Sequence, residues 1–229
     1  DLAVAAFLKQ ASDSGLSIDL RYRNSTDAVA SLSRGESDMA GFHVPLGEFE
    51  APAIERYRRW LEPKTHQLIH LAVRLQGLFV NPGNPLNIQT IDDLARSDVR
   101  FVNRQAGSGT RMLLELMMNR KDISPAQING FENTEFTHSA VAAFIASGMA
   151  DVGFGVQTAA ERFKLDFIPL VSERYFFAVN AEVLNQPHMN QLVSVLRSSG
   201  FRHVVNLLPG YDAARTGEIL TLSDAFAQS

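Results

Sequence analysis

The spacing of apolar and polar residues predicts helices and strands that alternate along the chain. Helical spacing is found from residue 2, from residue 24, over residues 48–61, 90–97, 107–120 and 139–147, and over most of residues 187–225. Strands are predicted at residues 16–22, 38–42, 66–80, 99–103, 151–155, 165–170 and 174–179. This alternation is typical of an α/β fold, and it favours sheets that are mainly parallel.

Turn-forming residues set the expected ends of these elements. Gly15 is expected to end the first helix. The apolar face of that helix consists of Leu2, Ala5, Ala6 and Leu8. Turns are expected at residues 81–85, which read NPGNP, and at residues 171–173, between two short strands. Pro209-Gly210 is expected to break the helical tail.

The composition is that of an ordinary globular protein. Of 229 residues, 45% are hydrophobic and 20% are charged, and this length suffices for one large domain or two small lobes. The formal net charge of −4 gives no electrostatic reason to expect direct contact with nucleic acid. The absence of cysteine excludes disulfides, thiolate catalysis and cysteine-based zinc sites.

The sequence shows no sign of a membrane segment. No apolar run approaches the roughly 20 residues that a membrane-spanning helix needs. The first ten residues contain Asp1 and Lys9 without a basic n-region, so they do not form a signal peptide. We therefore expect a cytoplasmic domain, or a periplasmic one if a signal peptide has been removed.

Residues 104–111 (RQAGSGTR) are the strongest candidate for a binding site. They connect a predicted strand to a predicted helix through glycine-flanked hydroxyl residues. Glycine lets a ligand approach the backbone closely, and the first N–H groups of a helix have no partner within it. Ser108 and Thr110 add hydroxyl donors, and Arg104 or Arg111 would supply a cation. This combination suits a compact oxyanion, although an ordinary helix start has the same residue types.

Two further helix starts carry hydroxyl groups. Ser25 and Thr26 precede one predicted helix, and Thr137, His138 and Ser139 precede another. Each alone is compatible with an N-cap that holds no ligand. In α/β folds, however, ligands bind outside the carboxyl ends of strands, where helix N-termini converge. Three such starts in one chain therefore favour an anion site.

The sequence matches known enzyme motifs poorly. Residues 106–110 lack the outer glycines of a G-x-S-x-G nucleophile elbow, and residues 107–111 lack the Lys-Ser/Thr ending of a P-loop. His66 and His70 have the spacing of zinc ligands on a helix, but their segment is predicted as a strand and no HExxH motif is present. A general base at His138 is the enzymatic alternative.

Several further segments form a set that extends over essentially the whole chain. They are RGESDMAG (34–41), QGL (76–78) with NP (84–85), DLAR (93–96), FVNRQAGSGTR (101–111), THSAVA (137–142), LDFIPL (165–170), ERY (173–175) and PGYD (209–212). Together they resemble the periplasmic-binding-protein-like domains related to molybdate and tungstate receptors. Among these segments, NRQ-GSGTR and ERY are the most specific to that family.

The resemblance implies a class II periplasmic-binding-protein fold, in which two α/β lobes joined by a two-strand hinge close on a ligand in the cleft between them. Lobe 1 would comprise residues 1–78 and 175–229, and lobe 2 would comprise residues 79–174. The resemblance also implies an oxyanion held largely by neutral donors. The expected ligand-binding residues are Ser25, Thr26, Arg104, Ser108, Gly109, Thr110, His138, Ser139 and Tyr175.

The chain departs from the family pattern at two places. The family has an opening Gly-Ser-His-Asp whose serine helps to hold the anion, and Asp1 corresponds to the last residue of that motif. Asn24 and Asp27 stand where the family is rich in glycine. A carboxylate there would repel molybdate or tungstate, but it would accept the proton of hydrogen phosphate.

We therefore expect a non-catalytic domain that binds a small oxyanion, with molybdate or tungstate first, and that needs no metal or other cofactor. The alternative is the ligand-sensing module of a transcriptional regulator, for phosphate, sulfate or an organic anion, or a pocket that has lost its ligand. The family's domains occur alone or fused to helix-turn-helix domains or molybdenum-cofactor enzymes. A fused DNA-binding or enzyme domain is thus an expected partner.

Overall fold

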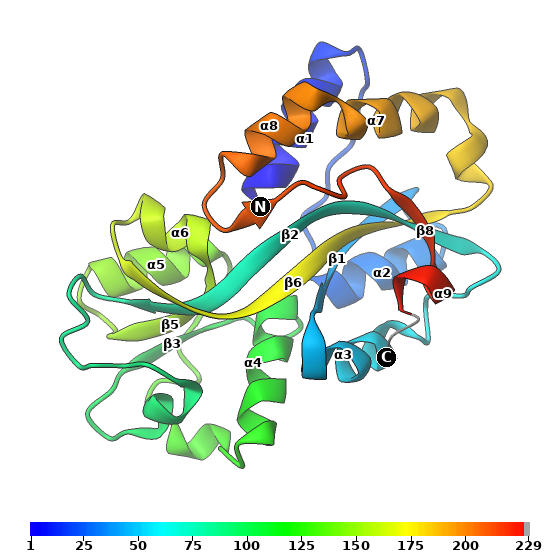
Figure 1. Cartoon of the computed structure of the whole chain (residues 1–229). Coiled ribbons are helices and arrows are strands. Elements are labelled where there is room, and N and C mark those ends of the chain that lie inside the picture. The colour runs from blue at the N-terminus through cyan, green and yellow to red at the C-terminus, as the bar shows by residue number, and fades with distance from the viewer. Residues whose placement is uncertain (227–229) are drawn as a thin grey trace. The chain divides into compact units, whose positions relative to one another are not determined.

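The computed structural model describes residues 1–226, which form two compact units (Figure 1). Unit 1 comprises Asp1–Arg74 and the chain from Glu173 onward, and unit 2 comprises Leu75–Ser172. Two long strands, β2 (His66–Val80) and β6 (Asp166–Asn180), contain both boundaries. The chain therefore passes between the units within extended strands.

Unit 1 is a mixed α/β unit. Its helices are α1 (Leu2–Asp13), α2 (Ser25–Ser33), the 3₁₀ helix η1 (Gly47–Phe49), α3 (Glu50–Tyr57), the 3₁₀ helix η4 (Val183–Asn185), α7 (Pro187–Arg197), α8 (Ser199–Asn206) and α9 (Leu222–Ala225). Its strands, besides parts of β2 and β6, are β1 (Met39–Pro45), β7 (Tyr211–Asp212) and β8 (Ile219–Thr221). Figure 1 shows α1, α7 and α8 gathered together, and α2 and α3 contact β1.

Helix α1 begins and ends where the sequence predicts, but its buried face differs from the prediction. The Asp1 carboxylate caps it by accepting from the N–H of Ala3 at 2.8 Å. The buried residues are Ala3, Phe7 and Ala11, one helical turn apart, whereas Leu2 is 41% exposed. The predicted face of Leu2, Ala5, Ala6 and Leu8 was wrong for Leu2 and Ala5, which are exposed, whereas Ala6 is half-buried against the core; the helix is apolar on more than one side. The ring of Phe7 decides which side is buried, since it packs against Phe201 of α8.

The strands of unit 1 correct three predictions. The expected turn at residues 171–173 does not form, because β6 is one continuous strand whose polar Glu173 is buried. Residues 16–22 form no strand, and most of their side chains are exposed. The helical tail breaks before Pro209-Gly210, as predicted, but most of the chain after it is not helical, since β7 and β8 pair with β2 before the short helix α9.

Unit 2 contains the parallel pairs of the fold. Its elements, besides parts of β2 and β6, are the 3₁₀ helix η2 (Ile91–Ala95), β3 (Phe101–Arg104), α4 (Gly109–Arg120), the 3₁₀ helix η3 (Pro125–Gln127), β4 (Thr134–Glu135), α5 (His138–Ala146), β5 (Val152–Val156) and α6 (Gln157–Arg162). Strand β3 is parallel to both β4 and β5. The strand pairs β1–β6, β2–β5, β2–β7 and β2–β8 are antiparallel. The expectation of mainly parallel sheets was therefore wrong, because alternation along the chain does not fix the direction in which strands pair.

Candidate functional site

The carboxyl ends of three parallel strands meet at one edge of unit 2. In the parallel register, Arg104 at the end of β3 lies beside Glu135 at the end of β4, and Val102 lies beside Gly153 of β5. A helix follows each strand: α4 follows β3, α5 follows β4, and α6 follows β5. Figure 1 shows α5 and α6 side by side, close to β5. The helix starts therefore converge at the edge where α/β folds bind ligands.

Helix α4 begins as the glycine-rich segment predicts. Ser108 is its N-cap, and the Ser108 hydroxyl oxygen accepts from the N–H of Arg111 at 3.1 Å. Gly107 has a φ of 81°, a conformation that favours glycine. The N–H groups of Gly109 and Thr110, as the first two of the helix, have no acceptor within it. This start combines backbone donors with the buried hydroxyl residues Ser108 and Thr110.

The two arginines beside this start have different surroundings. Arg111 pairs with Glu115 of the same helix at 3.0 Å, and its guanidinium lies 4.8 Å from the ring centre of Phe131. Arg104 donates from Nη2 to the carbonyl oxygen of Phe136 at 3.0 Å. Arg104 thereby ties the end of β3 to the loop before α5, and the side chain of Phe136 is 74% exposed there. Of the two cations, Arg104 lies at the converging edge.

Helix α5 is held close to β5 by two glycines. Its N-cap is Thr137, whose hydroxyl oxygen accepts from the N–H of Ala140 at 3.0 Å. A Cβ atom at Gly155 would lie 2.6 Å from Nδ1 of His138, and one at Gly153 would lie 2.5 Å from a methyl carbon of Val141. The ring of His138 therefore lies directly against the backbone of β5. His138 and Ser139 are both half-buried.

Helix α6 was missed by the sequence analysis. It begins at Gln157, directly after β5, and has no side-chain cap. The available signal was the run QTAAER, which consists mostly of good helix formers but is too short to show a helical period.

The start of α2, in unit 1, is built as the sequence predicts. Asn24 is the N-cap and accepts from the N–H of Asp27 at 2.8 Å. The side-chain amide of Asn24 also donates to the carboxylate of Asp27 at 2.8 Å, and Asp27 is exposed. Ser25 is buried and Thr26 is half-buried in the first turn. The carboxylate of Asp27 is thus already engaged by the amide of the cap.

Tyr175 and Ser25 are brought together by a residue that the sequence analysis did not name. His43 of β1 lies with its Nδ1 3.3 Å from the hydroxyl oxygen of Ser25. The ring centres of His43 and Tyr175 are 4.0 Å apart. The signal for His43 was the strand alternation after residue 38, which puts Gly41 and His43 on the same face.

Burial keeps the phenol of Tyr175 protonated. Tyr175 is 8% exposed, and burial raises the pKa of its hydroxyl to about 12, although the nearby Arg74 lowers that pKa. A Cβ atom at Gly41 would lie 2.8 Å from the Tyr175 hydroxyl, so glycine makes room for it. A phenol of this kind is a hydrogen-bond donor at neutral pH.

A buried ionic cluster supports this part of unit 1. Arg74, 2% exposed, pairs with Glu173, which is 1% exposed, and with Asp1. The Tyr211 hydroxyl donates to the Asp1 carboxylate at 2.6 Å. Burial alone would lower the pKa of Arg74, but Glu173 and Tyr211 raise it above its ordinary value. The guanidinium also lies 5.5 Å from the ring centre of Tyr175.

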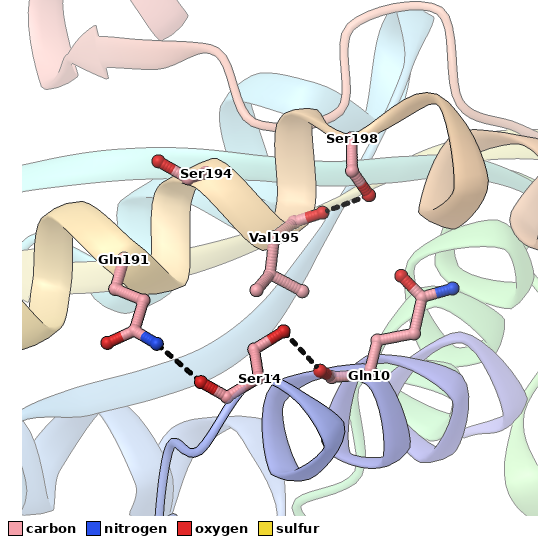
Figure 2. Close-up of a pocket in the computed structure, with 6 residues that line it drawn as sticks. All are labelled: Gln10, Ser14, Gln191, Ser194, Val195 and Ser198. Carbon is pink, nitrogen blue, oxygen red and sulfur yellow. Dashed lines mark hydrogen bonds between the residues drawn. The ribbon is translucent and has the colours of Figure 1, made fainter.

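A hollow in unit 1, between α1 and α7, does not contain any predicted site residue. Figure 2 shows that its polar side chains bond to neighbouring backbone: Gln191 donates to the carbonyl of Ser14, and the Ser14 hydroxyl donates to the carbonyl of Gln10. Ser198 likewise donates to the carbonyl of Val195. The hollow is therefore a less suitable anion site than the edge of unit 2.

The two histidines considered for zinc lie on a strand, as predicted. His66 and His70 belong to β2, and Nδ1 of His66 accepts from the N–H of Glu62 at 3.0 Å. Residues 1–226 contain no cluster of three or more His, Cys, Asp or Glu side chains that could hold a metal ion.

Comparison with known sequences identifies a family. The family model described as "PBP superfamily domain" matches residues 6–197. A Bacillus subtilis protein, "Uncharacterized protein YvgK", is 32% identical over 203 residues, which cover 87% of this chain and 64% of that protein. A Clostridium pasteurianum protein from the 5′ region of a 2Fe–2S ferredoxin gene is 35% identical over 111 residues, covering 48% of this chain and 98% of that protein. The chain thus spans less than two thirds of the Bacillus relative.

Comparison with solved structures confirms the predicted fold class. A structure described as a phosphate ABC transporter substrate-binding protein with bound phosphate, from Clostridium perfringens, has a TM-score of 0.62 at 13% identity, covering 89% of this chain and 91% of that chain. PhnD1 from Prochlorococcus marinus, in complex with methylphosphonate, has a TM-score of 0.61 at 17% identity, covering 100% of this chain and 89% of that chain. The regulatory domain of MetR, a LysR-family regulator from N. meningitidis, has a TM-score of 0.59 at 15% identity, covering 92% of this chain and 90% of that chain. In residues 1–226 no helix has the length and apolar character to cross a bilayer.

Proposed function

This chain belongs to the periplasmic-binding-protein superfamily, and on that premise we propose that it binds a small oxyanion without catalysing a reaction. The observation that carries the proposal is the convergence of the α4 and α5 starts at the carboxyl edge of β3 and β4. We assign the anion to the N–H groups of Gly109 and Thr110, the hydroxyls of Ser108, Thr110 and Ser139, and the side chains of Arg104 and His138. In unit 1, Ser25, Thr26 and Tyr175 are candidate donors of the same kind.

Molybdate or tungstate is our first proposal for the ligand. The groups assigned in unit 2 are N–H, hydroxyl, imidazole and guanidinium, and no carboxylate is among them. Such a set suits an oxyanion that carries no proton. In unit 1 the exposed carboxylate of Asp27 accepts from Asn24 and keeps further lone pairs for the proton of a protonated anion, which favours hydrogen phosphate instead. Phosphate is the alternative, in line with the ligand of the Clostridium perfringens structure.

An organic oxyanion is a second candidate, favoured by one observation. The ring of Phe136 is 74% exposed beside α5, and Arg104 bonds to the carbonyl of the same residue. An exposed ring at the rim of an anion site would contact an apolar substituent on the ligand. The similarity to a methylphosphonate-bound structure supports testing this class. The likeness to a LysR-family regulatory domain supports a sensing role, in which bound ligand shifts the domain between conformations.

A thermal-shift titration tests the proposal. The protein is titrated separately with molybdate, tungstate, sulfate, phosphate and methylphosphonate. A ligand at about 100 times its dissociation constant adds roughly 2.7 kcal/mol, which raises the melting temperature by several degrees. We expect the largest shift with molybdate or tungstate. No shift with any of the five anions would overturn the proposal.

Two serine N-caps provide a matched pair of variants. Ser108→Ala removes a cap of α4 and a proposed ligand hydroxyl, and Ser198→Ala removes the equivalent cap of α8, whose oxygen also accepts at 3.1 Å. Each loses about 1 kcal/mol of stability. Only Ser108→Ala is expected to lose anion affinity, by about tenfold, as measured by calorimetry. Equal affinities of the two variants would remove Ser108 from the site.

A further inference from the structure

We propose that Asn103, a buried residue of β3, is a positioning residue that fixes Arg104 for its contact with the oxyanion. The inference rests on the proposed function and deepens it, since Arg104 is the arginine assigned there to the anion. It concerns residues of unit 2 alone.

Asn103 is a polar residue at a position that suits an apolar one. The first three residues of β3, Phe101, Val102 and Asn103, are buried, and Asn103 is 2% exposed. Burying a side-chain amide costs free energy unless the amide is hydrogen-bonded, and an apolar residue there would avoid that cost. The hydrogen bonds of this amide therefore show what the residue contributes.

The amide of Asn103 joins two backbone groups. Its Nδ2 donates to the carbonyl oxygen of Phe131 at 3.2 Å. Its Oδ1 accepts from the N–H of Arg104 at 2.8 Å. One side chain thus connects the loop before β4 to the residue at the end of β3.

The bond to Arg104 satisfies an N–H that the sheet leaves open. Successive N–H groups of a strand point to opposite neighbours, and those of Asn103 and Gln105 donate to the carbonyl oxygens of Asn133 and Glu135 on the β4 side. The N–H of Arg104 therefore faces the β5 side. The register of β3 with β5, however, ends at residue 102. The side chain of Asn103 replaces the strand partner that is missing there.

The loop that anchors Asn103 is itself fixed to β3. The N–H of Phe101 donates to the carbonyl oxygen of Asn129 at 2.8 Å, and the N–H of Asn103 donates to that of Asn133 at 2.8 Å. These two bonds lie on either side of Phe131, which is 4% exposed. The carbonyl of Phe131 therefore has a fixed position and sets the orientation of the Asn103 amide.

Arg104 is thereby held at both ends. Its backbone N–H is bound by Asn103, and its Nη2 donates to the carbonyl oxygen of Phe136 at 3.0 Å. A guanidinium binds an oxyanion through N–H groups that lie in one plane, so the strength of the contact depends on its orientation. A side chain that is already oriented loses less conformational entropy when the anion binds. Asn103 thus supports anion binding through Arg104.

A double-mutant cycle of Asn103→Leu and Arg104→Met tests the inference, with affinities for molybdate and phosphate measured by calorimetry. Asn103→Leu makes neither amide bond and is expected to bind about tenfold more weakly. Arg104→Met removes a charge-assisted hydrogen bond and is expected to bind about thirtyfold more weakly. The loss in the double variant is expected to stay at about thirtyfold, because Asn103 then has no guanidinium to orient. A merely structural role would weaken binding by the same factor in both backgrounds.

Asn84→Leu is the matched control in unit 2. The amide of Asn84 also donates to one carbonyl and accepts from one N–H, both of Ile88, at 2.7 and 3.0 Å. Its φ of 45° adds strain for leucine. This variant is expected to have a lower melting temperature but the wild-type affinity for both anions, so that a loss of stability is separated from a loss of binding.

Three results would overturn the inference and leave the proposed function standing. The first is an equal loss from Asn103→Leu with and without Arg104→Met, and the second is wild-type affinity in either single variant. The third is that neither Asn103→Leu nor the smaller Asn103→Ala folds, as judged by circular dichroism, since Asn103 would then serve stability alone. No binding of molybdate or phosphate by the wild type would also overturn the inference, and the five-anion titration then decides whether the proposed function fails as well.

Discussion

The two units carry similar candidate chemistry but build it differently. In unit 2, the candidate donors belong to helix starts, where Ser108 and Thr137 cap α4 and α5 next to the ends of parallel strands. In unit 1, the cluster of Ser25, His43 and Tyr175 is assembled from three separate elements. The first arrangement depends on how closely backbones approach, and the second depends on long-range pairing and buried charge. The two regions should therefore fail under different kinds of mutation.

The largest expected effect is the loss of the buried cation of unit 1. Arg74→Met removes the buried cation that pairs with the carboxylates of Glu173 and Asp1. Removing one partner of a buried ion pair costs about 3–5 kcal/mol. Urea denaturation measures this loss as a lower free energy of unfolding.

The matched control is an arginine of unit 2. Arg100 pairs with Asp151 at 2.8 Å, but its side chain is 51% exposed, so Arg100→Met should cost about 0–1 kcal/mol. If the two variants lost similar amounts of unfolding free energy, buried charge would not be what distinguishes unit 1 from unit 2.

The next effect is steric and belongs to unit 2. Gly155→Ala places a Cβ atom 2.6 Å from Nδ1 of His138 and 2.7 Å from the ring of Phe79. Overpacking of this kind costs about 1–3 kcal/mol, and it would also displace His138 from the converging edge. We expect a lower melting temperature together with weaker anion binding.

Gly200→Ala is the control for this substitution. Gly200 lies in α8, and a Cβ atom there would have no neighbour within 4 Å. Alanine in a helix is favoured by up to about 1 kcal/mol over glycine, so this variant should be slightly more stable. A Gly155→Ala protein as stable as the wild type would show that α5 can move away from β5 at no cost.

The smallest effect is a pH dependence of stability in unit 1. His70 is 1% exposed and its ring lies against Phe176, and burial, with a further contribution from Arg215, lowers its pKa to about 4. The unfolded chain binds this proton with the ordinary pKa of about 6.5, so between these values the unfolded state holds more protons than the folded state. This contribution to stability is complete above about pH 6.5 and is lost as the pH falls toward 4. Between pH 7 and 5.5 the loss is about 1 kcal/mol.

Urea denaturation at several pH values measures this slope. His70→Leu should flatten it, apart from the part due to His66, whose pKa burial also lowers. His188→Leu, at an exposed position on α7, should leave it unchanged. An unchanged slope in His70→Leu would show that the ring of His70 is protonated without cost in the folded state.

Local signals in the sequence determined most elements of unit 2, though not β4 and α6, and one helix start of unit 1. The helix starts capped by Ser108, Thr137 and Asn24 were predicted from clusters of cap-forming residues, because an N-cap is decided within three or four residues of the chain. The long strand β2 was predicted at His66–Val80, the bounds it has in the structure, because apolar residues recur along the whole segment. The resemblance to the superfamily was also recognised from local segments of this kind.

Tertiary structure alone decided the rest. Glu173 looked like part of a turn and is buried in β6, because its charge is matched by Arg74, 99 residues away in the chain. Strand direction is also a non-local property, so alternation along the chain suggested parallel pairing where β1 pairs antiparallel with β6 and β2 pairs antiparallel with β5. The connection of Ser25 to Tyr175 through His43 depends on that antiparallel register. A sequence specifies each of these side chains, but only the paired backbone determines which of them meet.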